Sequence, residues 1–248
     1  MTPEIHVSAF RNGDHICFFY KDLEEQLATA APFVMLGLLR GERCLCVLPA
    51  NKMQPLFQAL ESLRVDVDKE VQRGALLIRS PEETYLKGGM FNREQMVKLL
   101  DEAMHESLKM GFAGFRGTGD LSWSISDTNT CGQMPGYEHM LNKYYPGKKS
   151  LGICMYDASL FDQDNLNRIM ESHRLALIHP APVKRAIRVR NAQGFGDVIF
   201  DRTSPRLFHY TVQQTGSNEF VHLGQESSLT AALAAVETTL QTLGPAAA

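Results

Sequence analysis

The sequence predicts an α/β protein with a parallel sheet between helices, followed by a small α+β appendage of antiparallel strands and one helix. Strand-like and helix-like segments alternate five times, which is typical of parallel strands joined by right-handed crossovers. The strand-like segments are apolar throughout, as strands buried on both faces must be. After residue 182 the pattern changes to short strand-like segments separated by turn residues, and this change predicts the appendage.

The five strand–helix pairs follow one another along the chain. We expect the first strand at His15–Phe19 and its helix from about Asp22, a residue with N-cap spacing, to Arg40, with Gly41 as the stop signal. The other strands are expected within the segments ERCLCVLP, GALLIRS, GFAGFRGTGDLSW and SLGICMYD. The other helices are expected after N-caps at Asn51 and Asn92 and within the segments GYEHMLNKYY and QDNLNRIMESHRLAL.

A domain boundary is predicted where the pattern changes. Residues 1–178 would form the main domain, His179–Pro182 a short linker, and residues 183–248 the appendage. Ser227 or Ser228 would cap the last helix. An appendage of about 65 residues lies near the lower limit for independent stability, so we expect it to need support from the main domain or a partner.

Composition limits the classes of partner. The formal net charge of −3 gives no broad attraction to nucleic acid or to an anionic membrane. No apolar run approaches the ~18 residues that span a bilayer, and the N-terminus lacks the apolar core of a signal peptide. The five cysteines are an odd number and lie mostly in apolar runs, which favours reduced, buried thiols and a cytoplasmic protein.

The carboxyl ends of the strands predict the site, because ligands of open parallel sheets bind there. The segment RGTGDLSW is the most informative, since it holds two glycines, an arginine, an aspartate and the only tryptophan. The alternative is a tight turn with a surface ion pair and one core tryptophan. The residues expected to bind the ligand are Tyr20, Lys21, Glu83, Arg116, Thr118, Asp120, Trp123, Tyr156 and Asp157.

Cysteine and histidine supply candidate metal ligands. His15 and Cys17 lie two residues apart on one strand, and Cys44 and Cys46 on another, so each pair shares a face. Such pairs bind zinc or softer metals, but small buried cysteines without a ligand are the common alternative. Strand one beside strand five would bring Cys17 near Cys154. His15 begins its strand opposite the expected pocket, which favours a structural role.

Five segments together resemble a known family: GDHICFFY, GLLRGERCLCVLP, FRGTGDLSW, YEHMLNKYY and LGICMYD resemble the MEDS domain, the methanogen/methylotroph sensory domain, in order and spacing. The resemblance covers residues 13–177. It implies a degenerate relative of the RecA/KaiC-type P-loop fold. It also implies a prokaryotic sensor of small molecules, such as simple hydrocarbon derivatives, that signals through a protein partner or through contacts in a homo-oligomer.

The corner between the first strand and its helix indicates a lost phosphate site. A P-loop needs G-x-x-x-x-G-K-[ST], whose backbone N–H groups cradle phosphate. The segment FFYKDLEEQL keeps Lys21 but lacks the glycines and the hydroxyl residue. Asp22, Glu24 and Glu25 instead place negative charge at the helix N-terminus, which stabilises the helix dipole and repels an anion. We therefore expect a non-catalytic sensory module without a cofactor.

Three other functions remain open at this point. Lys21, Asp120 and Glu83 could serve a divergent nucleotide hydrolase or transferase of the KaiC type. The chain could instead be a structural interaction module with a closed, dry core near Trp123. The cysteine and histidine pairs leave a metal or thiol-redox sensor as the third alternative.

Overall fold

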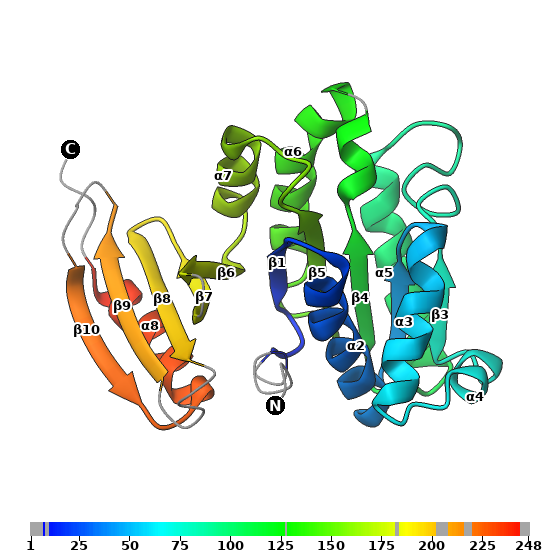
Figure 1. Cartoon of the computed structure of the whole chain (residues 1–248), viewed down its shortest axis with the longest axis horizontal. Coiled ribbons are helices and arrows are strands. Elements are labelled where there is room, and N and C mark those ends of the chain that lie inside the picture. Colours follow the sequence, from blue (N-terminus) through cyan, green and yellow to red (C-terminus); the bar gives the residue numbers. More distant parts are fainter. Residues whose placement is uncertain are drawn as a thin grey trace. The chain divides into compact units, whose positions relative to one another are not determined.

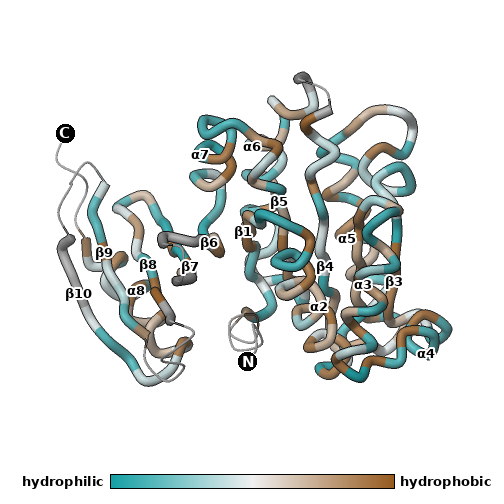
Figure 2. The backbone as a smooth tube through the Cα atoms, viewed as in Figure 1, coloured by the Kyte–Doolittle hydropathy of each residue, from teal (hydrophilic) through white to brown (hydrophobic). Residues whose placement is uncertain are grey.

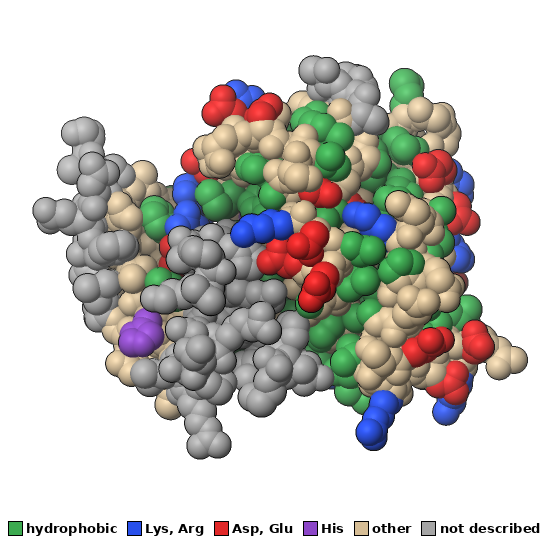
Figure 3. All heavy atoms as spheres, viewed as in Figure 1, with side chains coloured by type: hydrophobic (Ala, Val, Ile, Leu, Met, Phe, Trp, Pro, Cys, Tyr) green, Lys and Arg blue, Asp and Glu red, His purple; other side chains and the backbone are tan. Residues whose placement is uncertain are grey.

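A computed structural model describes residues 7, 10–126, 128–181, 184–201, 208–215 and 220–243. By its internal contacts the chain forms two compact units, residues 2–172 and residues 173–248. Within the described residues, no helix combines the length and the apolar character needed to cross a membrane. On the face drawn in Figure 3, acidic and basic side chains lie in small groups among hydrophobic ones, in keeping with the small net charge.

The first unit contains a parallel sheet with strands in the order β1-β5-β4-β2-β3. Every residue of β2 and β4 is buried, as are nearly all residues of β1 and β5, in keeping with strands that are covered on both faces. The strands are β1 (His15–Tyr20), β2 (Arg43–Val47), β3 (Leu76–Arg79), β4 (Phe115–Asp120) and β5 (Ser150–Asp157). The predicted α/β class with parallel strands is confirmed.

Helices cover both faces of this sheet, with α2 and α3 on one face and α5 and α6 on the other (Figure 1). Hydrophobic and hydrophilic residues alternate along α3 and α5 (Figure 2), so each helix presents an apolar side to the sheet. The helices are α2 (Leu23–Leu39), α3 (Ala50–Ser62), α4 (Val67–Gln72), α5 (Arg93–Lys109), α6 (Thr128–Tyr144) and α7 (Gln163–Glu171), with a 3-10 turn η1 (Ser122–Ser126).

Side-chain hydrogen bonds set several helix starts. Asp22 caps α2 by accepting from the Glu25 N–H, and Asn92 caps α5 by accepting from the Gln95 N–H, as predicted. Gly41, which ends the α2 segment, has φ of +71°, a backbone conformation that favours glycine. The predicted cap at Asn51 is wrong, because α3 begins at Ala50 and its N-cap is Pro49.

The second unit is an antiparallel sheet with strands in the order β6 to β10 and one helix, α8 (Leu229–Thr242), packed mainly on β8 and β9. Ser228 caps α8. The strands are β6 (Leu175–Ala181), β7 (Lys184–Arg190), β8 (Gly194–Asp201), β9 (Phe208–Gln214) and β10 (Phe220–Glu226).

Two predictions at the start of this unit are wrong. The helix expected to continue to Leu177 ends at Glu171, and the apolar residues after it form β6, where Leu175 pairs with Val189 and Leu177 with Ile187. The expected linker is also strand up to Ala181, while Pro182 lies outside the described residues. An apolar run of this length fits a buried strand as well as a helix. Pairing with β7 makes both segments part of a strand.

Candidate ligand-binding site

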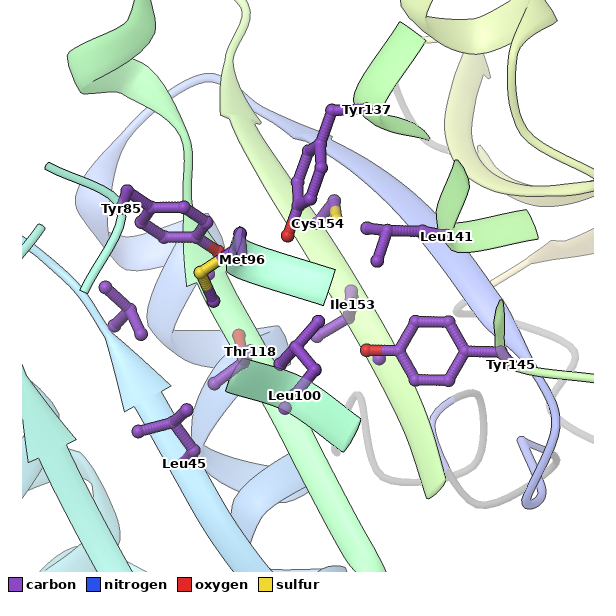
Figure 4. Close-up of a pocket in the computed structure, with 14 residues that line it drawn as sticks. Leu45, Tyr85, Met96, Leu100, Thr118, Tyr137, Leu141, Tyr145, Ile153 and Cys154 are labelled. Carbon is purple, nitrogen blue, oxygen red and sulfur yellow. The ribbon is translucent and has the colours of Figure 1, made fainter. Parts of the chain in front are cut away.

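A small internal cavity lies between the sheet and the helices α5 and α6 (Figure 4). Its volume is about 20 Å³, enough for a water-sized molecule without rearrangement. Strand side chains form the floor, helix side chains form the opposite wall, and Tyr85 reaches in from the segment after β3. The aliphatic part of the lining includes Leu45, Met96, Leu100, Leu141 and Ile153.

Three tyrosine rings enter the cavity from different sides, and their hydroxyl groups point inward (Figure 4). Tyr85 comes from the β3–α5 connection, Tyr137 from α6, and Tyr145 from the residue directly after α6. Burial raises the pKa of all three phenols well above the ordinary tyrosine value. The phenols therefore stay neutral at physiological pH, and each can donate one hydrogen bond and accept others.

Glycines in β4 and β5 make room for two of these rings. A Cβ atom added at Gly119 would overlap the hydroxyl of Tyr85, and one added at Gly152 would overlap the hydroxyl of Tyr145 and lie 2.6 Å from its Cζ. Gly117 and Gly152 stand opposite each other in neighbouring strands. The glycines of this sheet thus permit the close approach of tyrosine side chains.

An aromatic cluster adjoins the cavity. The Trp123 ring lies 5.1 Å from the Tyr85 ring and 5.4 Å from the Phe91 ring, between centroids. Phe91 also meets Tyr137 edge to face at 5.3 Å. Such pairs favour these offset and edge-to-face arrangements. The cluster connects two cavity-lining tyrosines with the η1 turn that leads into α6.

Asp120, at the end of β4, is the centre of a buried polar network on the other face of the sheet. Its carboxylate accepts hydrogen bonds from Lys52 Nζ at 2.7 Å, Gln26 Nε2 at 2.9 Å, the Tyr20 hydroxyl at 3.1 Å and the Ser122 N–H at 3.0 Å. Burial opposes ionisation of Asp120, but the Lys52 charge and these hydrogen bonds outweigh it and lower the pKa. The hydrogen bonds of this network join residues of the protein to one another, and they fix the position of the end of β4.

The corner after β1 is also internally satisfied. The Lys21 N–H donates to Glu25 Oε2 at 2.8 Å, and the Glu25 N–H donates to Asp22 Oδ1 at 2.9 Å. Carboxylates of the chain itself therefore occupy positions that a phosphate would take at a P-loop.

Five predicted ligand-binding residues lie at different places in the first unit and do not form one site. Thr118 lines the cavity, and Trp123 contacts Tyr85. Tyr20 and Asp120 belong to the polar network. Tyr156 is buried and donates its hydroxyl hydrogen to Glu138 Oε1.

The other predicted residues lie elsewhere. Arg116 was expected after β4, but the strand runs on to Asp120, so Arg116 is a buried strand residue whose Nε donates to Glu42 at 2.6 Å. Glu83 accepts from the Ser80 N–H at 2.8 Å, and Asp157 accepts from the Ser159 N–H at 3.0 Å. Both carboxylates stabilise local turns.

Sequence reasoning missed two of the main lining residues, Tyr137 and Tyr145. One signal was available, because residues 137, 141 and 145 follow helical spacing and share a face. The rule that selects strand ends could not find them, since they cover the middle of the sheet.

The candidate metal ligands divide between the two faces. Cys44 donates its Sγ hydrogen to the Val34 carbonyl oxygen of α2, and burial raises its pKa to about 12. Cys46 lies two residues along the same strand and shares that face. His15 Nε2 lies 3.4 Å from Cys154 Sγ. Cys17 is the direct neighbour of Cys154 across β1 and β5, as predicted, and burial raises the pKa of both thiols.

The fold is an α/β domain with a small internal cavity, and comparisons identify its family. The family model for MEDS, the methanogen/methylotroph, DcmR sensory domain, matches residues 14–174, which is more than half of the chain. The chain therefore belongs to the MEDS family of sensory domains.

Two individual proteins are similar to the chain. The transcriptional repressor DcmR of Methylorubrum extorquens (strain DSM 6343 / CIP 106787 / DM4) is 23% identical over 175 residues, which cover 67% of this chain. The match spans 60% of the length of that repressor. A crystal structure of a KaiC-like protein from Pyrococcus horikoshii OT3 matches with a TM-score of 0.47 and 13% identity, covering 73% of this chain and 80% of that one.

Proposed function

We propose that the cavity between the sheet and α5 and α6 binds a small, uncharged organic molecule, and that this binding is the sensory event. The observation that carries the proposal is the convergence of three neutral phenol hydroxyls on a cavity that is otherwise mostly apolar. Pockets of this composition select ligands by shape and by a few hydrogen bonds. The chain would act as a non-catalytic module of a prokaryotic regulator.

The lining favours a neutral ligand of small size. Among the described residues that line the cavity, none has a charged side chain. A buried anion or cation would lack a partner there, and an unpaired buried charge is strongly unfavourable. With a volume of about 20 Å³ the cavity holds only a water-sized molecule as it stands, so a simple hydrocarbon derivative such as a halomethane or a short alcohol would enter only when the tyrosine rings move.

The aromatic cluster offers a route for the signal. A ligand that displaces Tyr85 or Tyr137 would also shift the packing of Trp123 and Phe91. Trp123 belongs to the η1 turn, which joins β4 to α6. Binding would then favour one of two arrangements of this turn, as in other ligand-driven population shifts.

The corner geometry favours a sensor over a nucleotide enzyme. Asp22 and Glu25 already accept N–H groups where α2 begins, and Asp120 is held by Lys52, Tyr20 and Gln26. Asp120 and Glu83 therefore have separate local partners. A triphosphate at this corner would meet negative charge at close range.

A binding experiment with three probes tests the proposal. Saturation-transfer NMR would be recorded on the full chain with dichloromethane, ethanol and acetate. We expect saturable binding of dichloromethane and ethanol and none of acetate, because the cavity is neutral and acetate is charged. Equal binding of acetate, or no saturable binding of either neutral probe, would contradict the proposal.

The Tyr145→Phe variant separates hydrogen bonding from shape. Loss of the Tyr145 hydroxyl is expected to weaken ethanol binding by about 2- to 10-fold, which is the effect of losing one hydrogen bond. Dichloromethane binding should change by less than about twofold, because dichloromethane is a poor hydrogen-bond partner. Tyr144→Phe is the matched control, since Tyr144 is the adjacent residue and does not line the cavity. Equal losses in both variants would count against a role for the Tyr145 hydroxyl.

A further inference from the structure

A second cluster of chemically competent side chains lies on the same face of the sheet as the cavity. His15 begins β1, Cys154 lies in β5, and Glu138 lies in α6. His15 Nε2 is 3.0 Å from Glu138 Oε2 and 3.4 Å from Cys154 Sγ, and one ligand atom from each of the three residues lies within 4.8 Å of the others. All three side chains are buried, with Glu138 at 0% exposure.

Neighbouring groups orient both the imidazole and the carboxylate. The Asn142 side-chain NH₂ donates to the Ser172 carbonyl oxygen, which turns Asn142 Oδ1 toward His15 Nδ1 at 3.0 Å. Since Oδ1 only accepts, Nδ1 carries the hydrogen. The Tyr156 hydroxyl donates to Glu138 Oε1 and so directs Oε2 toward His15. Metal-binding histidines are typically oriented by such a hydrogen bond from the other ring nitrogen.

The orientation places His15 Nε2 against a carboxylate oxygen at 3.0 Å. In the neutral imidazole that nitrogen is a hydrogen-bond acceptor, and two acceptors at this distance repel each other unless a proton or a cation lies between them. A proton would give a buried histidine–glutamate pair. A metal ion would engage the Cys154 sulfur as well.

We propose that His15, Glu138 and Cys154 bind a zinc ion. Nitrogen, carboxylate oxygen and thiolate are the ligand types that zinc takes in proteins. Tetrahedral bonds of the usual lengths place such ligand atoms about 3.3 to 3.6 Å apart. The observed 3.0 Å and 3.4 Å lie close to that range before any adjustment.

Charge balance also favours the ion. Glu138 and a Cys154 thiolate together carry two negative charges, which a divalent cation neutralises in a buried site. Binding would release the thiol proton to solvent. Because Cys154 also lines the cavity, the zinc site would adjoin it.

The test uses the metal alone, so it does not depend on any organic ligand. The full chain would be equilibrated with zinc, dialysed and analysed for metal, and a parallel sample would be loaded with cobalt(II). We expect about one ion per chain and a thiolate-to-cobalt charge-transfer band. Cys154→Ser should abolish the band and lower zinc affinity at least about tenfold, and Glu138→Gln should lower it by a similar factor.

Cys46→Ser is the matched control, because Cys46 is equally buried but lies on the α2 face of the sheet. It should keep both the metal content and the band. Wild-type protein that retains no zinc, or a cobalt complex without a thiolate band, would overturn the proposal and leave the histidine–glutamate pair as a protonated structural contact. If Cys154→Ser does not fold by circular dichroism, the wild-type spectrum and Glu138→Gln decide the question.

Discussion

Replacing Asp120 by alanine is expected to lower the free energy of unfolding by about 3–5 kcal/mol, the usual effect of removing one partner from a buried charged pair. The variant deprives Lys52, Gln26 and Tyr20 of their shared acceptor in the interior. Urea unfolding followed by Trp123 fluorescence measures the effect, because the only tryptophan lies in the first unit and reports on that unit.

Asp157→Ala is the control for this prediction. Asp157 ends the neighbouring strand β5, but within the described part of the chain its carboxylate accepts hydrogen bonds only from Ser159, two residues further on. Its loss should change the free energy of unfolding by about 1 kcal/mol or less.

The lowered pKa of Asp120 makes the stability difference between the wild type and Asp120→Ala depend on pH. The wild-type advantage should be complete above the unfolded-state pKa of about 3.9 and should disappear as pH falls through the lower folded-state pKa. Equal effects of the two variants would contradict the central place of Asp120.

Gly119→Ala is expected to destabilise the first unit by about 1–3 kcal/mol through overpacking and to abolish binding of dichloromethane and ethanol. The added Cβ overlaps the Tyr85 hydroxyl and forces that ring to move into the cavity or out of the aromatic cluster. Urea unfolding and saturation-transfer NMR measure the two effects on the same protein.

A second substitution tests whether this overlap is the cause. Tyr85→Phe removes the hydroxyl, and the nearest remaining atom of the ring is then Cζ, 3.2 Å from the added Cβ. The double variant should recover about 1 kcal/mol relative to the sum of the two single changes. Tyr137→Phe also removes a cavity hydroxyl but does not relieve Gly119, so it should give no recovery. Recovery with both phenylalanines, or with neither, would refute the packing explanation.

The sheet was predictable because most of its strands lie in short apolar segments that alternate with helix-like segments, and because two of the helices have a recognisable N-cap. SLGICMYD matches β5 residue for residue, and Asp22 and Asn92 cap their helices as their spacing indicates. The C-terminal end of β4 was harder to predict. RGTGD contains the polar and glycine residues of a loop, but pairing with β2 and β5 keeps it in the sheet.

The site was only partly predictable, because it depends on contacts between distant residues. The sequence directed attention to the glycines of RGTGDLSW, but the side chains that lie against them belong to the distant residues Tyr85 and Tyr145. The pairing of His15 with Glu138 joins residues far apart in the chain, and only the β1–β5 register together with α6 brings them into contact. Local spacing carries no information of this kind.

Intermolecular NOEs between dichloromethane and the methyl groups of the full chain test the central claim most directly. At saturating probe, we expect NOEs to the methyl groups of Ile153, Leu100 and Leu141, which line the cavity from β5, α5 and α6. NOEs confined to exposed methyl groups, such as those of Leu39 or Leu160, would show that the small molecule binds only the surface and would contradict the account.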